Sequence, residues 1–270
     1  MTVKVSSIGL KGLEGYRVQV EVQMSKGTES MVIVGLPDAS VKESKERVLS
    51  AIRTLECDVT DQKIVVNLSP SEQKKNGPFF DLAMSIGVLK EMGEIKEDIP
   101  EDIAFIGALS LDGTIINVEG TLPALIAAKE LGFKAILLPY DPVIPFDLVE
   151  GLECHVVHHI QDVLQFLKGQ VSLPVHPINP VTIDAHTTRS YEKDFAHVIG
   201  HEHAKLALEV AAAGGHHVLM SGPPGCGKSL LAETFPSILP PLTNKKQLEV
   251  ISFYQLAQEK LVTSLSPPYR

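Results

Sequence analysis

The sequence predicts a mixed α+β fold in two parts, and three observations support this prediction. The 270 residues are 44% apolar and 21% charged, which is the composition of a globular protein and not of a disordered or fibrous one. Through about the first 168 residues, runs with strand-like alternation follow runs with helical periodicity. After a proline-containing stretch, a short apolar run leads into a glycine-rich loop and a helix, which predicts an α/β unit.

The N-terminal part should begin with four strands and one helix. The alternating or β-branched runs at 3–10, 16–24, 30–37 and 63–70 predict strands, and 10–15 predicts the turn between the first two. A helix is expected before the fourth strand. Its start is predicted by Ser40 and Glu43, which have the spacing of a capping box, and its apolar residues share one face: Val41, Val48, Leu49, Ile52 and Leu55.

The rest of this part is predicted to alternate helices and strands. Gly132 follows a helical run and is expected to end it in the left-handed conformation. In chain order, the expected elements are a helix at 79–92, a strand at 103–111, a helix at 122–132, a strand at 134–139 and a helix at 160–169.

Three segments are predicted along the chain: an N-terminal domain at 1–168, an extended linker at 169–190 and a second domain at 191–270. The second domain should open with a helix from His201 that ends at Gly214 and Gly215, followed by an apolar strand at 216–221. The small apolar residues of that helix are expected to form its packing face: Ala204, Leu206, Ala207, Val210 and Ala211.

A phosphate-binding loop follows the predicted strand, because Gly222, Gly227, Lys228 and Ser229 satisfy G-x-x-x-x-G-K-[ST] before a helix. The glycines let successive backbone N–H groups face a phosphate. Lys228 would neutralise the outer phosphates and the Ser229 hydroxyl would bind Mg2+, so the loop predicts ATP and Mg2+ as cofactors. Within the loop, Pro223 and Pro224 should fix the backbone, Gly225 completes the turn, and Cys226 is expected to fill space.

Hydrolysis requires a second acidic residue after a buried strand, and the remaining chain supplies no good candidate. The acids after Ser229 are Glu233, Glu249 and Glu259, and none follows four apolar strand residues. We therefore assign no catalytic residue, and expect weak or absent nucleotide binding and no hydrolysis by this chain alone.

The charge distribution argues against nucleic-acid binding by bulk electrostatics. Residues 1–170 contain 16 Lys and Arg against 25 Asp and Glu, and residues 171–270 contain eight of each, so the net charge of −9 lies in the first part. The loop at 72–77 could contact a phosphate, although a solvated turn is the simpler interpretation. Without a long apolar run or a secretion signal, a cytoplasmic protein that does not bind a membrane is expected.

Three stretches resemble the YifB/ComM group of magnesium-chelatase-like AAA+ ATPases: residues 34–52, 69–89 and 195–229. The resemblance implies a motor that assembles with itself into a hexameric ring and, for the ComM branch, a DNA helicase that promotes branch migration. It also places Val198, Ile199 and Leu230 at the nucleotide. Members of the group continue with the second acidic motif, sensors and an arginine finger, so this chain resembles their N-terminal part.

The N-terminal part also resembles the peptidase domain of Lon and the related domain of RadA, through residues 108–139. Lon-type peptidases use a Ser-Lys dyad. Here the nucleophile position after Gly77-Pro78 is occupied by Phe79, and the lysine position by Leu122. The resemblance therefore implies a peptidase-like fold without its dyad.

Two alternatives to a DNA motor stay open. One is the motor subunit of a metal chelatase, against which the Lon-like N-terminal part counts. The other is an active peptidase that uses Ser85 and Lys90, which lie five positions apart on a predicted helix and are poorly matched as a dyad.

Overall fold

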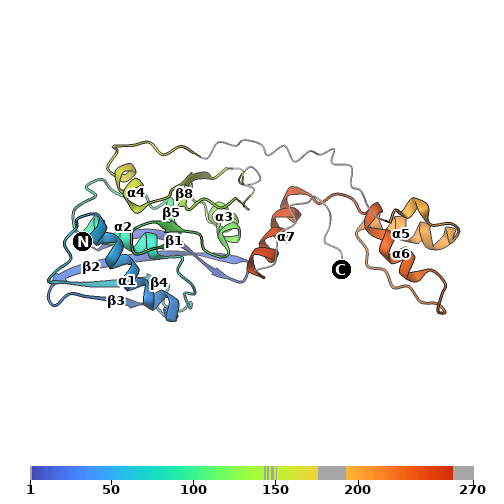
Figure 1. The fold of residues 1–270 in the computed structure, drawn as a ribbon, viewed down its shortest axis with the longest axis horizontal. Coiled ribbons are helices and arrows are strands. Elements are labelled where there is room, and N and C mark those ends of the chain that lie inside the picture. The colour runs from blue at the N-terminus through green and yellow to red at the C-terminus, as the bar shows by residue number, and fades with distance from the viewer. Residues whose placement is uncertain are drawn as a thin grey trace. The chain divides into compact units, whose positions relative to one another are not determined.

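The computed structural model describes residues 2–142, 144, 146, 149, 151–175 and 193–257, which divide into two compact units. The first unit comprises residues 1–179 with 252–261, and the second comprises 180–251 with 262–270. Figure 1 gives the order of the elements. The predicted linker is described only up to residue 175, and the rest of it lies outside the described residues.

The first unit is built on a seven-stranded mixed sheet in the order β3-β4-β2-β1-β5-β8-β9. The long antiparallel pair β1–β2 holds its centre, and the strands from β1 to β9 on one side are all parallel to one another. The strands are β1 (Val3–Lys11), β2 (Glu14–Lys26), β3 (Ser30–Val34), β4 (Gln62–Ser69), β5 (Ile103–Phe105), β8 (Ala135–Leu138) and β9 (Glu153–Val156).

Helices cover both faces of the sheet around β1 and β2. On one face, Gly87 of α2 lies so close to Val22 that an added Cβ would be 2.6 Å from its Cγ2 atom. On the other face, an added Cβ on Gly15 would be 2.1 Å from the Cβ of Ala127 in α3. Glycine at both positions therefore permits close helix–sheet packing. The helices of this unit are α1 (Ala39–Thr54), α2 (Asp81–Glu91), α3 (Thr121–Glu130) and α4 (Ile160–Leu167).

The start of α1 corrects one prediction. Its N-cap is Asp38, whose Oδ1 accepts from Val41 N at 2.8 Å, so the capping box proposed for Ser40 and Glu43 is wrong. Asp38 also accepts from Gly77 N at 3.1 Å through Oδ2. A cap that also binds a distant loop cannot be identified from local spacing, and Asp38 therefore joins the helix to the loop before α2.

The predicted strand at 103–111 is interrupted. It forms β5 and β6 (Ala108–Leu109), because Gly107 between them has φ 145°, a conformation that breaks the ladder. β6 pairs with β7 (Ile115–Ile116) in a separate hairpin. The predicted end of the following helix at Gly132 is confirmed, since Gly132 has φ 78° directly after the C-cap Leu131.

The second unit contains short helices around a small core. Its elements are η2 (Phe195–His197), α5 (Glu202–Gly214), α6 (Lys228–Thr234), η3 (Phe235–Ile238) and the start of α7 (Asn244–Leu256), whose last residues belong to the first unit. The core consists of Phe195, Val198, Leu208 and Leu231.

In this unit, the predicted packing face of α5 is right only in part, since its Ala211 is buried and its Ala204 packs against the core, and the predicted strand is wrong. α5 buries Leu208, Ala211 and Ala212, whereas Leu206 and Val210 of the predicted packing face are about 60% exposed (60% and 59%). The segment 216–221 is not a strand, because no described segment pairs with it, and Leu219 is 95% exposed. A strand requires a neighbour to satisfy its backbone groups, so apolar sequence alone was not sufficient to form one.

Among the helices described in both units, none is long and apolar enough to cross a membrane.

Candidate functional site

The loop at 222–227 leads into α6 through two left-handed glycines. Gly225 and Gly227 both lie in the left-handed region, with φ 80° and 82°, which only glycine adopts without strain. Gly227 is the N-cap of α6, so Lys228 and Ser229 form the first turn of that helix. The N–H groups of this turn point toward the loop, where an anion would meet them.

The Lys228 side chain closes over this loop. Its Nζ donates to the carbonyl oxygens of Gly222 and Pro223 at 2.8 and 2.7 Å and lies 3.4 Å from Cys226 Sγ. A nucleotide that uses Lys228 must therefore replace these two hydrogen bonds. In this conformation the carbonyl oxygens of the loop accept the hydrogen bonds of the Lys228 ammonium group.

Side chains from nearby segments surround the loop closely. A Cβ on Gly222 would lie 3.0 Å from Cys226 Sγ, and one on Gly227 would lie 3.2 Å from Nε2 of His201. The space-filling role predicted for Cys226 agrees with this contact. His201, which precedes α5 with φ 59°, was not predicted as a neighbour of the loop.

The other residues predicted to contact a nucleotide differ widely in solvent exposure. Val198 is 3% exposed because it packs in the core of the second unit, whereas Ile199 is 94% exposed. Pro223, Pro224 and Leu230 are exposed. Their predicted role at a nucleotide stays a prediction.

In the first unit, the two positions aligned with a Ser-Lys dyad hold buried apolar side chains. Phe79 is 7% exposed and Leu122 is fully buried. The Phe79 ring lies near the start of α3, with Cζ 3.6 Å from the Cβ position of Gly120. Neither side chain can act as nucleophile or base.

The alternative dyad of Ser85 and Lys90 is not assembled either. The buried Ser85 hydroxyl donates to Asp81 O at 2.9 Å. Lys90 Nζ donates instead to the carbonyl oxygens of Lys96 and Glu97, at 3.0 and 2.8 Å. Each group is thus engaged with a different part of the backbone.

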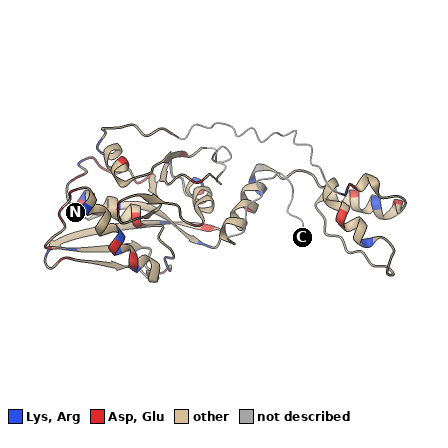
Figure 2. Ribbon diagram, in the orientation of Figure 1, with Lys and Arg blue, Asp and Glu red and all other residues tan. Residues whose placement is uncertain are grey.

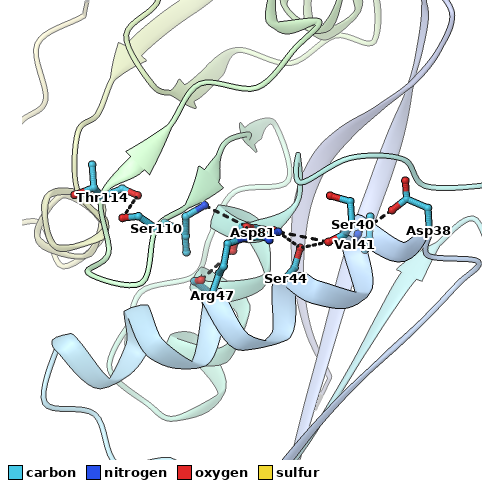
Figure 3. A network of polar contacts seen from close by, with 10 residues as sticks. Asp38, Ser40, Val41, Ser44, Arg47, Asp81, Ser110 and Thr114 are labelled. Carbon is cyan, nitrogen blue, oxygen red and sulfur yellow. Dashed lines mark hydrogen bonds and ion pairs between the residues drawn. The ribbon is translucent and has the colours of Figure 1, made fainter.

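A buried ion pair joins α1 to the start of α2 (Figure 3). Asp81 is fully buried, and its carboxylate accepts from Arg47 Nε at 2.6 Å and from Leu109 N at 3.1 Å. Arg47 also donates to Ser44 Oγ at 2.8 Å. Burial raises the pKa of the Asp81 carboxyl, while the hydrogen bonds from Arg47 and Ser44 oppose this shift.

Sequence reasoning did not identify this pair. The only sequence signals for it were an arginine among the exposed positions of one helix and an aspartate at the start of the next helix. Lys75 was also missed. It is fully buried, its Nζ donates to Pro70 O, and burial lowers the pKa of its amine.

Two family models match the chain in succession. Residues 20–142 match the model described as subunit ChlI of Mg-chelatase, and residues 194–270 match the model described as magnesium chelatase, subunit ChlI. The first match lies in the first unit. Both descriptions name a subunit of magnesium chelatase, so the chelatase alternative stays open.

Several curated relatives match over nearly the whole chain. Competence protein ComM of Haemophilus influenzae is 32% identical over 250 residues, which are 93% of this chain and 49% of ComM. The uncharacterized protein YifB of Escherichia coli is 34% identical over 251 residues, 93% of this chain and 48% of YifB. The chain spans about half the length of these relatives.

A weaker similarity links the chain to Lon proteases. The Lon protease of Clostridioides difficile is 26% identical over 173 residues, which are 60% of this chain and 22% of the protease. A similarity to Lon agrees with the resemblance noted at residues 108–139. An identity of 26% does not by itself assign a peptidase fold.

Proposed function

Because the chain belongs to the magnesium-chelatase-like family of the ComM and YifB proteins, we propose that it carries the ATP- and Mg2+-binding part of a ring-forming AAA+ motor. In the proposed full-length protein, ATP hydrolysis drives DNA branch migration. The DNA part of this proposal rests on the resemblance to the ComM branch, of which one relative is named a competence protein.

The observation that carries the nucleotide proposal is the conformation of the loop at 222–227. Two left-handed glycines lead into the first turn of α6, where Lys228 and Ser229 follow directly. When bound, ATP would supply the phosphoryl group and Mg2+ would neutralise phosphate charge. Lys228 would contact the outer phosphates and Ser229 the metal, while Val198, Ile199 and Leu230 are proposed to lie near the base or sugar.

The N-terminal domain at 1–168 is proposed to be a peptidase-like fold that has lost its dyad and serves assembly or DNA contact. Its similarity to Lon supports the fold, and the buried Phe79 and Leu122 support the loss of the dyad. Basic and acidic positions alternate along α1 in Figure 2, so a DNA contact here would involve individual side chains and not a basic surface of that helix.

Titration calorimetry with ATP and Mg2+ tests the nucleotide site. We expect binding weaker than about 10 μM, because Lys228 is held by two loop carbonyls and the segment before the loop pairs with no described strand. Lys228→Ala should abolish it. The matched control is Lys246→Ala, which removes an exposed lysine of the same unit and should leave binding unchanged.

One result would contradict the expected weak binding, and another would contradict the assignment of the nucleotide site to this loop. Submicromolar affinity would show that the loop is already organised for the nucleotide. Equal affinity of Lys228→Ala and the unchanged chain would show that ATP binds elsewhere.

The DNA part requires a separate experiment on a polypeptide of the relatives' full length. We expect its ATP hydrolysis to be stimulated by branched DNA. Hydrolysis without any such stimulation would remove the helicase proposal and leave nucleotide binding intact.

The chelatase motor is a second candidate, favoured by the descriptions of both matching family models. It predicts that a porphyrin-binding partner, and not DNA, stimulates hydrolysis. A peptidase is disfavoured by the separate hydrogen bonds of Ser85 and Lys90, and casein turnover abolished by Ser85→Ala would reverse that conclusion.

A further inference from the structure

The N terminus of α3 lacks a cap of its own. Its N-cap residue is Gly120, which has no side chain to accept a hydrogen bond from the first turn. The Thr121 hydroxyl is directed backward, since it donates to Val118 O at 2.7 Å. Because the first N–H groups of a helix have no partner within it, Leu122 N needs an acceptor from another segment.

Gln255 provides this acceptor from the other end of the described chain. Its Oε1 accepts from Leu122 N at 3.1 Å, across 133 positions of sequence. Both residues belong to the first unit. The Gln255 carboxamide thus acts as the N-cap that Gly120 cannot supply.

Leu256 fills an apolar position beside this hydrogen bond. Its Cδ2 lies 3.3 Å from the point where a Cβ on Gly120 would stand, and Leu10 and Phe79 approach the same point at 2.7 and 3.6 Å. Glycine is therefore favoured at position 120 for two reasons. It adopts φ 85° without strain, and its missing side chain leaves room for three apolar side chains.

We propose that the N terminus of α3, with Leu10 and Phe79, is a docking socket for residues 252–256 of the same chain. Gln255 supplies the polar anchor and Leu256 the apolar one. Among the contacts described, the segment is held by the hydrogen bond from Leu122 N to Gln255 and by Leu256, which is 38% exposed. The neighbouring Phe79 occupies the position aligned with a peptidase nucleophile. This proposal does not depend on nucleotide or DNA binding.

Amide hydrogen exchange by NMR on the 270-residue chain tests the socket. In Gln255→Ala, exchange of the Leu122 amide should become about five- to ten-fold faster, because the loss of a cap exposes that N–H more often. Gln255→Glu should keep Leu122 protected, since a carboxylate is also an acceptor and is favoured at a helix N terminus. Phe253→Ala, at a position 59% exposed, is the matched control and should change nothing.

Two further readouts decide the outcome. The amide of Val66, in β4 between β2 and β3, reports global stability and should exchange equally in all variants. Unchanged exchange of Leu122 in Gln255→Ala would overturn the proposal. Protection of Leu122 that rises with protein concentration would also overturn it, because the occupant would then come from a second copy.

Discussion

At the scale of single residues, the Asp81 carboxylate depends on one arginine. Asp81 is fully buried, and Arg47 is the cation that contacts it. Removal of one partner from a buried pair leaves an uncompensated charge, whereas removal of both can be nearly neutral. We expect Arg47→Met to lower the free energy of unfolding by about 3–5 kcal/mol, and Arg47→Met with Asp81→Leu to recover most of that loss.

Acidification should partly rescue Arg47→Met. Burial already raises the pKa of Asp81, and the loss of Arg47 removes groups that oppose this rise. A carboxyl whose pKa is higher in the folded state binds its proton more tightly there, so stability increases as the pH falls through the folded pKa toward the lower unfolded pKa. Urea denaturation at pH 7 and pH 5 measures the effect. Arg53→Met is the control, since its partner Glu29 lies at the surface. If Arg53→Met lowered the free energy of unfolding as much as Arg47→Met does, burial of the pair would not be the cause of the loss.

At the scale of elements, the turn between β6 and β7 is organised by one acid. The Asp112 carboxylate accepts from Ser110 Oγ and from Thr114 N, the latter at 3.0 Å, and these hydrogen bonds lower its pKa to about 2. The Asp112 carbonyl lies 2.9 Å from Nε2 of His159, the N-cap of α4. The acid thus also supports the contact between the hairpin and that helix.

This turn should loosen in acid. The folded pKa of Asp112, about 2, lies below the value near 3.9 of an unfolded chain, so its contribution to stability is complete above about pH 4 and is lost as the pH falls toward 2. NMR titration of the Asp112 carboxyl and of the Thr114 amide should show this transition. Asp112→Asn should abolish it, and a midpoint near 4 in the unchanged chain would contradict the hydrogen-bonded turn.

The elements also show what the sequence could and could not predict. The long strands β1, β2 and β4 were predicted from alternation, and α1 from its apolar face, because each has enough residues for a period to be visible. The two-residue strands β6 and β7 have no period, and their pairing depends on the turn at Asp112. The left-handed glycines before α6 could be expected from the sequence because their conformation is a local requirement, whereas the Arg47–Asp81 pair required the tertiary structure.

At the scale of the whole molecule, the two units differ in how much apolar surface they bury. The first has a continuous core on both faces of its sheet. The described part of the second buries far fewer apolar residues, among them the cluster of Phe195, Val198, Leu208 and Leu231, while Ile199 and Leu219 are 94% and 95% exposed. Since stability scales with the apolar surface removed from water, the second unit should be the weaker of the two.

We therefore expect the chain to unfold in two steps, the second unit first. Leu231→Ala should lower the midpoint of the first step only, and Leu68→Ala that of the second step only, because each leucine is buried in the core of a different unit. Each substitution should lower the free energy of unfolding of its own unit by about 2–5 kcal/mol. Urea titration followed by the amide resonances of Leu208 and Val66 separates the steps. Leu219→Ser, at a 95% exposed position, should change neither midpoint. A single transition that both alanine variants shift equally would mean that the units unfold as one cooperative structure, with each stabilised by the other.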